Sequence, residues 1–500
     1  MELVQEPFRS LQLAAEAYTT QEEVAEAVVS DVLPDAARVV DTRATVTVRD
    51  RLPREGGAEI RATVHMHVLC AAERAQGGEK LICIETPLVF THRAELPGAP
   101  ADAELMCDAK LLNADARLLN PRKLSVRAEL SFHTRAYAAV QTAVTTGLAG
   151  DESLMLLRRR ANLRTAAETC IKHFTVIDEV PVPDADLAEP LFCTAEMTAA
   201  ETLCAAGQLT IRGRAVVRLL YNDSRELAQS GLYEIPFEQI IEMPSVTDAM
   251  QGETVLTLKT TEMSPAEDTS GQKVLSVSIG VCAETVLFEE REVSVLTDAY
   301  STAYQTEIGL ESFAFDEPIE PWEQRIPAEE KLEAPYPITR LIDWSMGIRG
   351  DAEAEADGAV FHILFQAICE GDDGLLFGVT RRLPVSVDAP CSAACLQAGI
   401  EGASVTLNDG PAVRFTLVVR GGCTADRVLD MVSAIEEGEP IRNEEGPALI
   451  LRFPAAETVW ALAKEYHASL QTVRMLNGLD EMADMGQETA RSPMLIPRVQ

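Results

Sequence analysis

The stretch Gln208–Tyr221, which reads QLTIRGRAVVRLLY, decides the fold class of this chain. Apolar and polar side chains alternate along most of it, and this period-two pattern indicates a strand with one buried face. Gly213 interrupts the pattern, which is typical of a bend in a strand. The segment Asn222–Ser224 that follows has the composition of a turn. Shorter stretches such as Ala44–Val48 alternate in the same way, so we predict a mainly β chain of antiparallel strands.

A short motif that ends in proline occurs twice. Phe90–Pro97 and Phe237–Pro244 both read Phe, four residues, Glu, one residue, Pro. A long apolar strand is predicted before each motif, and another strand begins roughly 30 residues after each, near Lys123 and Val274. The spacing of about 145 residues is that of a repeated domain rather than of a solenoid repeat.

A third, weaker copy follows in the segments Ala359–Ile368, Leu383–Pro390 and Val413–Val419. Each copy also opens with a strand that ends in an apolar residue and a proline: Leu33-Pro34, Val180-Pro181 and Ile326-Pro327. We therefore predict three antiparallel repeats, each a β-sandwich or a barrel-like sheet, and the pattern leaves both alternatives open.

The repeats are expected to be separate domains joined by linkers. The predicted bounds are 1–145, 166–298 and 299–425 for the repeats, 146–165 and 426–446 for the linkers, and 447–500 for a C-terminal domain. The first linker is predicted to be helical, because Asp151–Arg160 combines apolar spacing with good helix formers. Asp351–Gly358 has the composition of an exposed acidic hairpin tip.

The charge of the chain excludes several classes of partner. It carries 43 basic and 79 acidic side chains, a formal net charge of −36. Phosphate backbones and anionic lipid surfaces repel such a chain, so we expect no binding to nucleic acid. The start, Met1–Glu6, lacks the basic and apolar regions of a signal peptide, and no apolar stretch reaches the roughly 20 residues of a membrane span. These features predict a cytoplasmic protein.

The sequence carries little that indicates catalysis, and we predict no enzyme, no cofactor and no metal. It contains no phosphate-binding glycine loop, no Gly-x-Ser-x-Gly and no His-Glu-x-x-His. Cys391 and Cys395 are close in sequence, but no further ligand lies near them. His65 and His67 are expected on one face of a strand and could share a metal, although an ordinary strand face is the preferred interpretation.

The C-terminal segment has a different character. Ala448–Phe453 and Met494–Pro497 are predicted strands. Between them, Glu457–Tyr466 has the apolar face of a helix. Ser469 is the expected N-cap of a second helix that ends at Asn477-Gly478. The prediction is a small α+β domain with the order βααβ, in which Trp460 and Tyr466 are structural.

This segment resembles a LysM domain. Ala456–Trp460 stands where that family has Gly-Asp-Thr-Leu-Trp, Ala463–Tyr466 matches Ala-Lys-x-Tyr, and Leu495–Pro497 matches its ending. The first loop departs from the family pattern, and the lead-in to the last strand is longer. The resemblance implies that a glycan or a protein partner binds to two loops, which comprise Ala455, Ala456, Glu457 and Thr458 in the first and Asn477, Gly478, Leu479 and Asp480 in the second.

The repeats resemble the SPOCS-domain proteins of spore-forming Firmicutes. Tyr233–Phe237, with Glu242 and Pro244 after it, fits the repeat signature, and Leu88–Phe90 fits it without the proline. Together with the LysM-like tail, the resemblance implies a non-enzymatic scaffold in spore coat assembly, made in the mother cell and recruited to the forespore surface. The implied partner is a coat morphogenetic protein resembling SpoIVA. Binding of peptidoglycan or N-acetylglucosamine polymers is the alternative, and exposed strand edges could support self-association.

Overall fold

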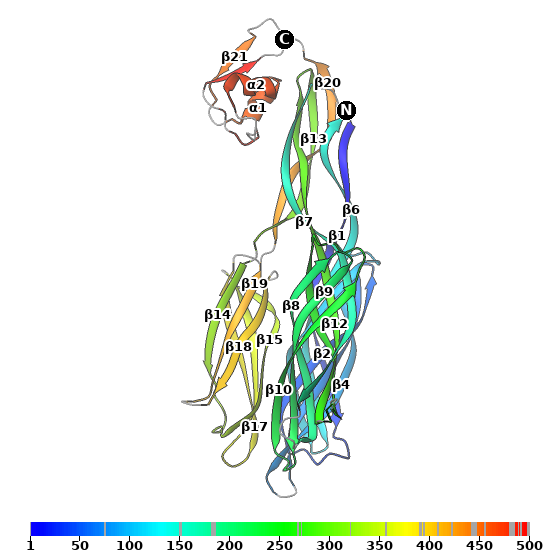
Figure 1. The fold of residues 1–500 in the computed structure, drawn as a ribbon, viewed down its shortest axis with the longest axis vertical. Coiled ribbons are helices and arrows are strands. Elements are labelled where there is room, and N and C mark those ends of the chain that lie inside the picture. The colour runs from blue at the N-terminus through cyan, green and yellow to red at the C-terminus, as the bar shows by residue number, and fades with distance from the viewer. Residues whose placement is uncertain are drawn as a thin grey trace.

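The computed structural model is mainly β and elongated (Figure 1). It describes residues 2–74, 77–149, 153–181, 187–267, 270–271, 273–320, 322–355, 358–389, 393, 396–407, 410–421, 424–441, 448–454, 457–479, 486–488, 490 and 493–497. Of the sequence predictions, those for Cys391, Cys395, Ala455, Ala456 and Asp480 lie outside these residues.

The first repeat consists of a three-stranded antiparallel sheet and three strands of a six-stranded sheet that continues into the second repeat. Its strands are β1 (Glu2–Val28), β2 (Arg38–Arg54), β3 (Gly57–Glu73), β4 (Glu79–Glu95), β5 (Glu104–Asn120) and β6 (Lys123–Ala149). Strands β2, β3 and β4 form a meander, and β6 pairs with both β1 and β5. Alternate side chains of both sheets, such as Val64 and Phe132, point into a shared core.

The second and third repeats have the same strand order. The second consists of β7 (Leu154–Pro181), β8 (Leu187–Ala205), β9 (Gln208–Asp223), β10 (Ala228–Glu242), β11 (Met250–Glu267) and β12 (Lys273–Ser301). The third consists of β13 (Tyr304–Pro318), β14 (Trp322–Lys331), β15 (Arg340–Glu355), β16 (Gly358–Glu370), β17 (Leu376–Asp388), β18 (Leu396–Thr406), β19 (Ala412–Gly421) and β20 (Thr424–Pro440). In the third repeat, the first and the last strand along the chain are each divided in two, into β13 with β14 and β19 with β20.

The register of the meanders shows that the three units are equivalent residue by residue. The first meander strand carries a bulge at the same place in each unit, next to Val40, Leu191 and Ile342. The motifs beginning at Phe90 and Phe237 occupy matching positions in β4 and β10. The sequence prediction of three copies of one antiparallel unit agrees with this topology.

The predicted helix at Asp151–Arg160 is wrong. From Leu154 onward this segment belongs to β7 and pairs with the end of β12, from Leu154 opposite Ser301 to Arg160 opposite Ser294. Good helix formers occupy these positions, but a long partner strand supplies a hydrogen-bonding partner for the backbone all along the segment. Tertiary pairing therefore overrides the local preference.

The two predicted linkers are paired strands over most of their lengths. Residues 146–149 belong to β6 and residues 154–165 to β7, and β20 pairs with β13 through most of 426–446. These strand ends extend beyond the three sandwiches as three ribbons, β1 with β6, β7 with β12, and β13 with β20, which form the stalk in the upper half of Figure 1. Val144, Val295 and Phe313 come from the three ribbons and are buried together in the stalk.

At the opposite end the three meanders pack against one another around the meander junction. This junction is the buried cluster of Val40, Leu69, Ala71, Leu81, Leu191, Phe192, Leu220, Ala228, Ile342, Ile368 and Leu376. All three repeats contribute to it, so the outer faces of the three meanders form one apolar core. Burial of these faces holds the repeats together.

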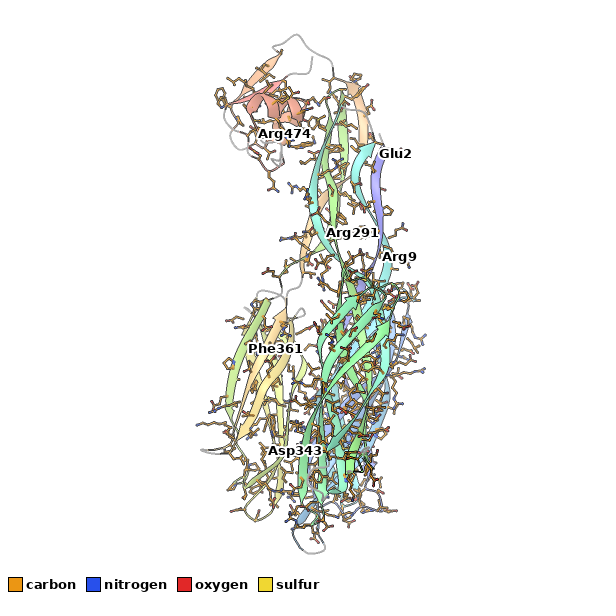
Figure 2. The ribbon with its side chains drawn as sticks, in the orientation of Figure 1. Glu2, Arg9, Arg291, Asp343, Phe361 and Arg474 are labelled. Carbon is orange, nitrogen blue, oxygen red and sulfur yellow. The ribbon has the colours of Figure 1, made fainter. Side chains whose placement is uncertain are left out.

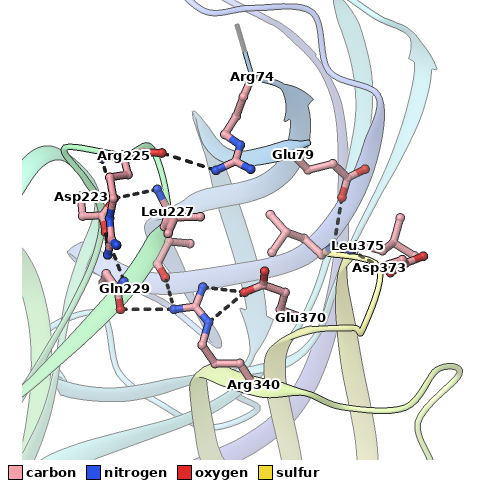
Figure 3. Close-up of polar contacts among 12 residues, drawn as sticks. Arg74, Glu79, Asp223, Arg225, Leu227, Gln229, Arg340, Glu370, Asp373 and Leu375 are labelled. Atoms are coloured by element: carbon pink, nitrogen blue, oxygen red, sulfur yellow. Dashed lines mark hydrogen bonds and ion pairs between the residues drawn. The ribbon is translucent and has the colours of Figure 1, made fainter. Parts of the chain in front are cut away.

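A closed set of hydrogen bonds surrounds the junction. Arg38 of the first repeat donates to the carbonyl of Leu376 in the third, and Arg340 of the third donates to the carbonyl of Ala228 in the second, at 3.1 Å. Asn222 of the second repeat donates to the carbonyl of Leu81 in the first, at 2.9 Å. The three acceptors are equivalent positions at the starts of β4, β10 and β17. Figure 3 shows part of this set, with Arg340 between Gln229 and Glu370.

Buried charges cross the same interface. Arg43 on β2 bonds to Asp41 at 2.9 Å and to Asp343 on β15 at 2.6 Å, and Arg218 on β9 bonds to Asp343 at 3.1 Å. The Asp343 side chain is 1% exposed, and Figure 2 places it low in the molecule, far from the stalk. Burial lowers the pKa of Arg43, but the two carboxylates outweigh it and the net shift is upward. The cluster therefore stays charged and links all three repeats.

Neither helix in the described part of the chain has the length and the apolar character that crossing a membrane requires.

Candidate docking module

The C-terminal segment folds with the element order predicted for it. Strands β21 (Leu449–Arg452) and β22 (Met494–Pro497) pair antiparallel, and helices α1 (Val459–Glu465) and α2 (Leu470–Asn477) lie between them in the chain. Val459, Leu462, Val473 and Ile496 form its small core. We call residues 448–497 the C-terminal module.

The module is anchored to the end of the stalk through Asp298 on β12. The indole Nε1 of Trp460 donates to Asp298 Oδ2 at 2.7 Å, and the ammonium of Lys464 lies 2.6 Å from Asp298 Oδ1. Trp460 also packs edge-to-face on Tyr300, with ring centroids 5.0 Å apart. Trp460 therefore joins the module to the second repeat as well as filling the module core.

A second set of contacts reinforces this attachment. The Tyr300 hydroxyl donates to the Ala468 carbonyl at 2.6 Å, and His467 Nδ1 lies 3.1 Å from the Ser301 carbonyl oxygen. Burial raises the pKa of Tyr300, which keeps the hydroxyl protonated and able to donate. Met155 and Leu157 of β7 pack on the module core as well. These two residues belong to the segment Asp151–Arg160, for which the helix prediction was wrong, and they form part of the surface against which the module packs.

The described residues of the first predicted loop have structural contacts. The Thr458 hydroxyl accepts from the backbone N–H of Ala461 at 3.2 Å and caps α1. The Glu457 carbonyl accepts from the N–H of Ala490, and its carboxylate lies 3.6 Å from Arg452. Both residues help to close the module, and the Glu457 side chain remains 41% exposed and reachable by a partner.

Asn477, in the second predicted loop, holds α2 against β22. Its amide donates to the carbonyls of Val473 at 2.8 Å and Leu495 at 2.7 Å, and its side-chain oxygen accepts from the N–H of Leu495 at 2.7 Å. Gly478 follows with φ of 60°, the left-handed conformation that ends the helix, and Leu479 packs on the module core. The Asn477 amide therefore has three partners inside the module.

The module also carries an exposed apolar row that the sequence analysis did not single out. Leu449, Leu451 and Phe453 alternate along β21 and its continuation and are 44%, 53% and 67% exposed. Leu495 on β22 stands directly opposite Leu451 and therefore shares its face. The sequence shows the period-two spacing of these residues. It does not show which face of the β21–β22 pair the helices cover.

No family model, curated protein or solved structure matches the chain. The contacts of the described residues, together with the sequence motifs, are therefore the grounds for assigning a function.

A second group of residues gathers far from the module. His67 on β3 and Cys83 and Glu85 on β4 place one ligand atom each within 4.8 Å of one another. The sequence pattern pairs His67 with His65, whereas Cys83 and Glu85 stand in no motif that would single them out. Those two residues alternate on β4, and only the register, which sets Glu85 opposite His67, brings them to the histidine.

Proposed function

We propose that this chain is a non-enzymatic scaffold of the bacterial spore envelope, whose C-terminal module docks onto a coat morphogenetic protein resembling SpoIVA at the forespore surface. The motif resemblances of the repeats and the tail support this assignment. The exposed apolar row of Leu449, Leu451 and Phe453 is the observation that carries the docking step.

The chemistry of that row favours a protein partner. Aliphatic and aromatic side chains that stand in water along one strand lower the free energy when a complementary apolar surface covers them. Met475 on α2, 77% exposed, adds a further apolar side chain to the module surface. Sugar polymers need polar groups that pair with their hydroxyls, and the Asn477 amide of the second loop already bonds within the module.

The arrangement of the molecule suits a scaffold. Three repeats share one junction at one end, and the stalk holds the module at the other (Figure 1). Contacts of Trp460, Lys464 and Tyr300 fix the module on the stalk, so a partner bound to the module is held at a defined place relative to the repeats.

The test is direct binding of a purified SpoIVA-type coat protein to the full-length chain, measured by biolayer interferometry. The double variant Leu451→Ser/Phe453→Ser is expected to weaken binding roughly tenfold or more, because two buried apolar contacts are lost. Val428→Ser is the matched control, since Val428 is an exposed aliphatic residue of a stalk strand.

Equal binding by the double variant and the wild-type chain would refute the docking row, and equal binding by a chain that lacks residues 447–500 would refute the docking module altogether. Titration with N-acetylglucosamine oligomers and peptidoglycan fragments tests the alternative. Heat released on binding these glycans, together with no binding to the coat protein, would replace protein docking by glycan recognition.

A further inference from the structure

A cavity of about 340 Å³ lies between the first and second repeats. Its walls include His65, His67 and Glu85 from the meander of the first repeat, and Phe192 and Cys193 from β8 of the second. The wall that the first repeat contributes therefore carries three side chains with metal-binding atoms, and Cys193 and Glu262 carry such atoms on the wall of the second repeat.

His67, Cys83 and Glu85 are the closest group on that side. His67 Nδ1 lies 3.4 Å from Glu85 Oε1, and the ligand atoms of all three residues are within 4.8 Å of one another. His67 Nδ1 is buried and, apart from this ion-pair contact with Glu85, has no hydrogen-bond partner in the described part of the chain. Coordination to a metal ion would give this nitrogen and the Glu85 carboxylate a shared partner in place of a direct hydrogen bond.

We propose that His67, Cys83 and Glu85 form a Zn²⁺ site with three protein ligands and a fourth position open to the cavity. Imidazole, thiolate and carboxylate are the three ligand types that zinc takes in proteins, whereas Mg²⁺ and Ca²⁺ prefer oxygen ligands alone. A site with three protein ligands keeps one exchangeable position, which water occupies when no other ligand enters from the cavity. This proposal is independent of the scaffold function.

The strand register already brings the three ligands close together, so a metal ion can bind without refolding of the chain. Glu85 stands directly opposite His67, and Cys83 lies two residues along β4 on the same face. Ligand atoms around tetrahedral zinc are roughly 3.5 Å apart. Side-chain rotations that move the ligand atoms by about an ångström therefore complete the geometry. The Glu85 side chain is 66% exposed and free to make that movement.

The positive charge of Arg43, which neighbours the site, is compensated by carboxylates. Arg43 stands opposite His67 on β2, but its guanidinium is bonded to the carboxylates of Asp41 and Asp343. Asp343 also compensates Arg218, so the two carboxylates and the two guanidinium groups of this cluster balance one another. When zinc binds, the Cys83 thiol loses its proton to solvent and the thiolate forms the zinc–sulfur bond, with no change in oxidation state.

Cobalt(II) titration of the reduced full-length chain tests the site, because a thiolate bound to Co²⁺ gives a charge-transfer absorption in the near ultraviolet. We expect this band to saturate at one cobalt per chain and to disappear when zinc is added. Cys83→Ser is expected to abolish the band. The double variant Cys391→Ser/Cys395→Ser, which removes the close cysteine pair of the sequence, is expected to keep it.

Glu85→Gln provides a variant at an exposed position, for which folding is not in question. It is expected to retain the band and to weaken cobalt binding roughly tenfold or more, because an anionic ligand becomes neutral. The site would be overturned by no thiolate band in the wild-type chain, by an unchanged band in Cys83→Ser, or by unchanged affinity in Glu85→Gln. A band lost only in the Cys391/Cys395 variant would place the metal elsewhere.

Discussion

At the scale of single residues, a side chain in a loop that resembles a binding loop can serve the fold instead. The sequence placed Asn477 among the residues that a partner or glycan would contact. In the structure its amide makes two hydrogen bonds that join α2 to Leu495 on β22, and a third to the Val473 carbonyl within α2. The sequence motif does not distinguish a ligand-binding asparagine from one that stabilises the fold. An asparagine that ends a helix can turn its side chain outward or back onto a neighbouring strand.

Asn477→Ala is therefore expected to destabilise the C-terminal module by about 2 kcal/mol, since the N–H and carbonyl of Leu495 lose their partners. Hydrogen exchange at the amides of α2 and β22 measures the effect. Gln471→Ala, on an exposed position of α2, is the control and is expected to leave exchange unchanged. Unaltered protection in Asn477→Ala would show that the three bonds contribute nothing to the module.

At the scale of elements, the stalk exists because several strands are longer than the repeats to which they belong. β7 continues from the second repeat into the stalk and pairs with β12 along its whole course. Its first residues, Leu154–Arg160, have a local preference for helix that pairing overrides. The same extension occurs in β13 and β20, which face each other in the stalk and set Asp316 directly opposite Asp426.

Like charges directly opposite each other destabilise a strand pair. Partial burial, together with the facing Asp426 carboxylate, raises the pKa of Asp316. Because the folded state binds the proton more tightly than the unfolded state, stability falls as the pH rises above about 3.9, the ordinary aspartate value, and the loss is complete above the raised pKa.

Asp426→Asn is expected to stabilise the stalk by about 0.5 kcal/mol at pH 7 and to have a smaller effect in acid, where Asp316 is protonated and no longer repels a facing carboxylate. Thermal unfolding in acid and at neutral pH measures the difference. Asp430→Asn is the control, because Asp430 on the same strand faces Ser312 instead of a carboxylate. An equal gain at low and neutral pH would contradict the electrostatic explanation.

At the scale of the whole molecule, three copies of one unit form a single body with approximate threefold character. Equivalent bulges place Val40, Leu191 and Ile342 in the meander junction, and equivalent carbonyls accept hydrogen bonds from the neighbouring repeat. Asp343 lies in this junction and compensates Arg43 and Arg218 from the two other repeats.

Asp343→Ala is expected to lower the free energy of unfolding by about 3–5 kcal/mol, because it leaves two largely buried guanidinium groups without this carboxylate. Urea unfolding, followed by circular dichroism, measures the loss. Asp388→Ala, at an exposed position of the same meander, should leave the urea midpoint within error of the wild type. A similar small effect of both substitutions would mean that the charge cluster does not hold the repeats together.

The sequence by itself determined the strand-forming pattern, the three copies and the order of elements in the C-terminal module. These features follow from side-chain periodicity and from helix-ending signals such as Gly478, which act within a few residues. Only the tertiary structure decided that Leu154–Arg160 is strand, that Asp343 compensates two arginines, and that His67 meets Cys83 and Glu85. Each of these depends on strand pairing or packing between segments far apart in the chain, and local preferences contain no information about such partners.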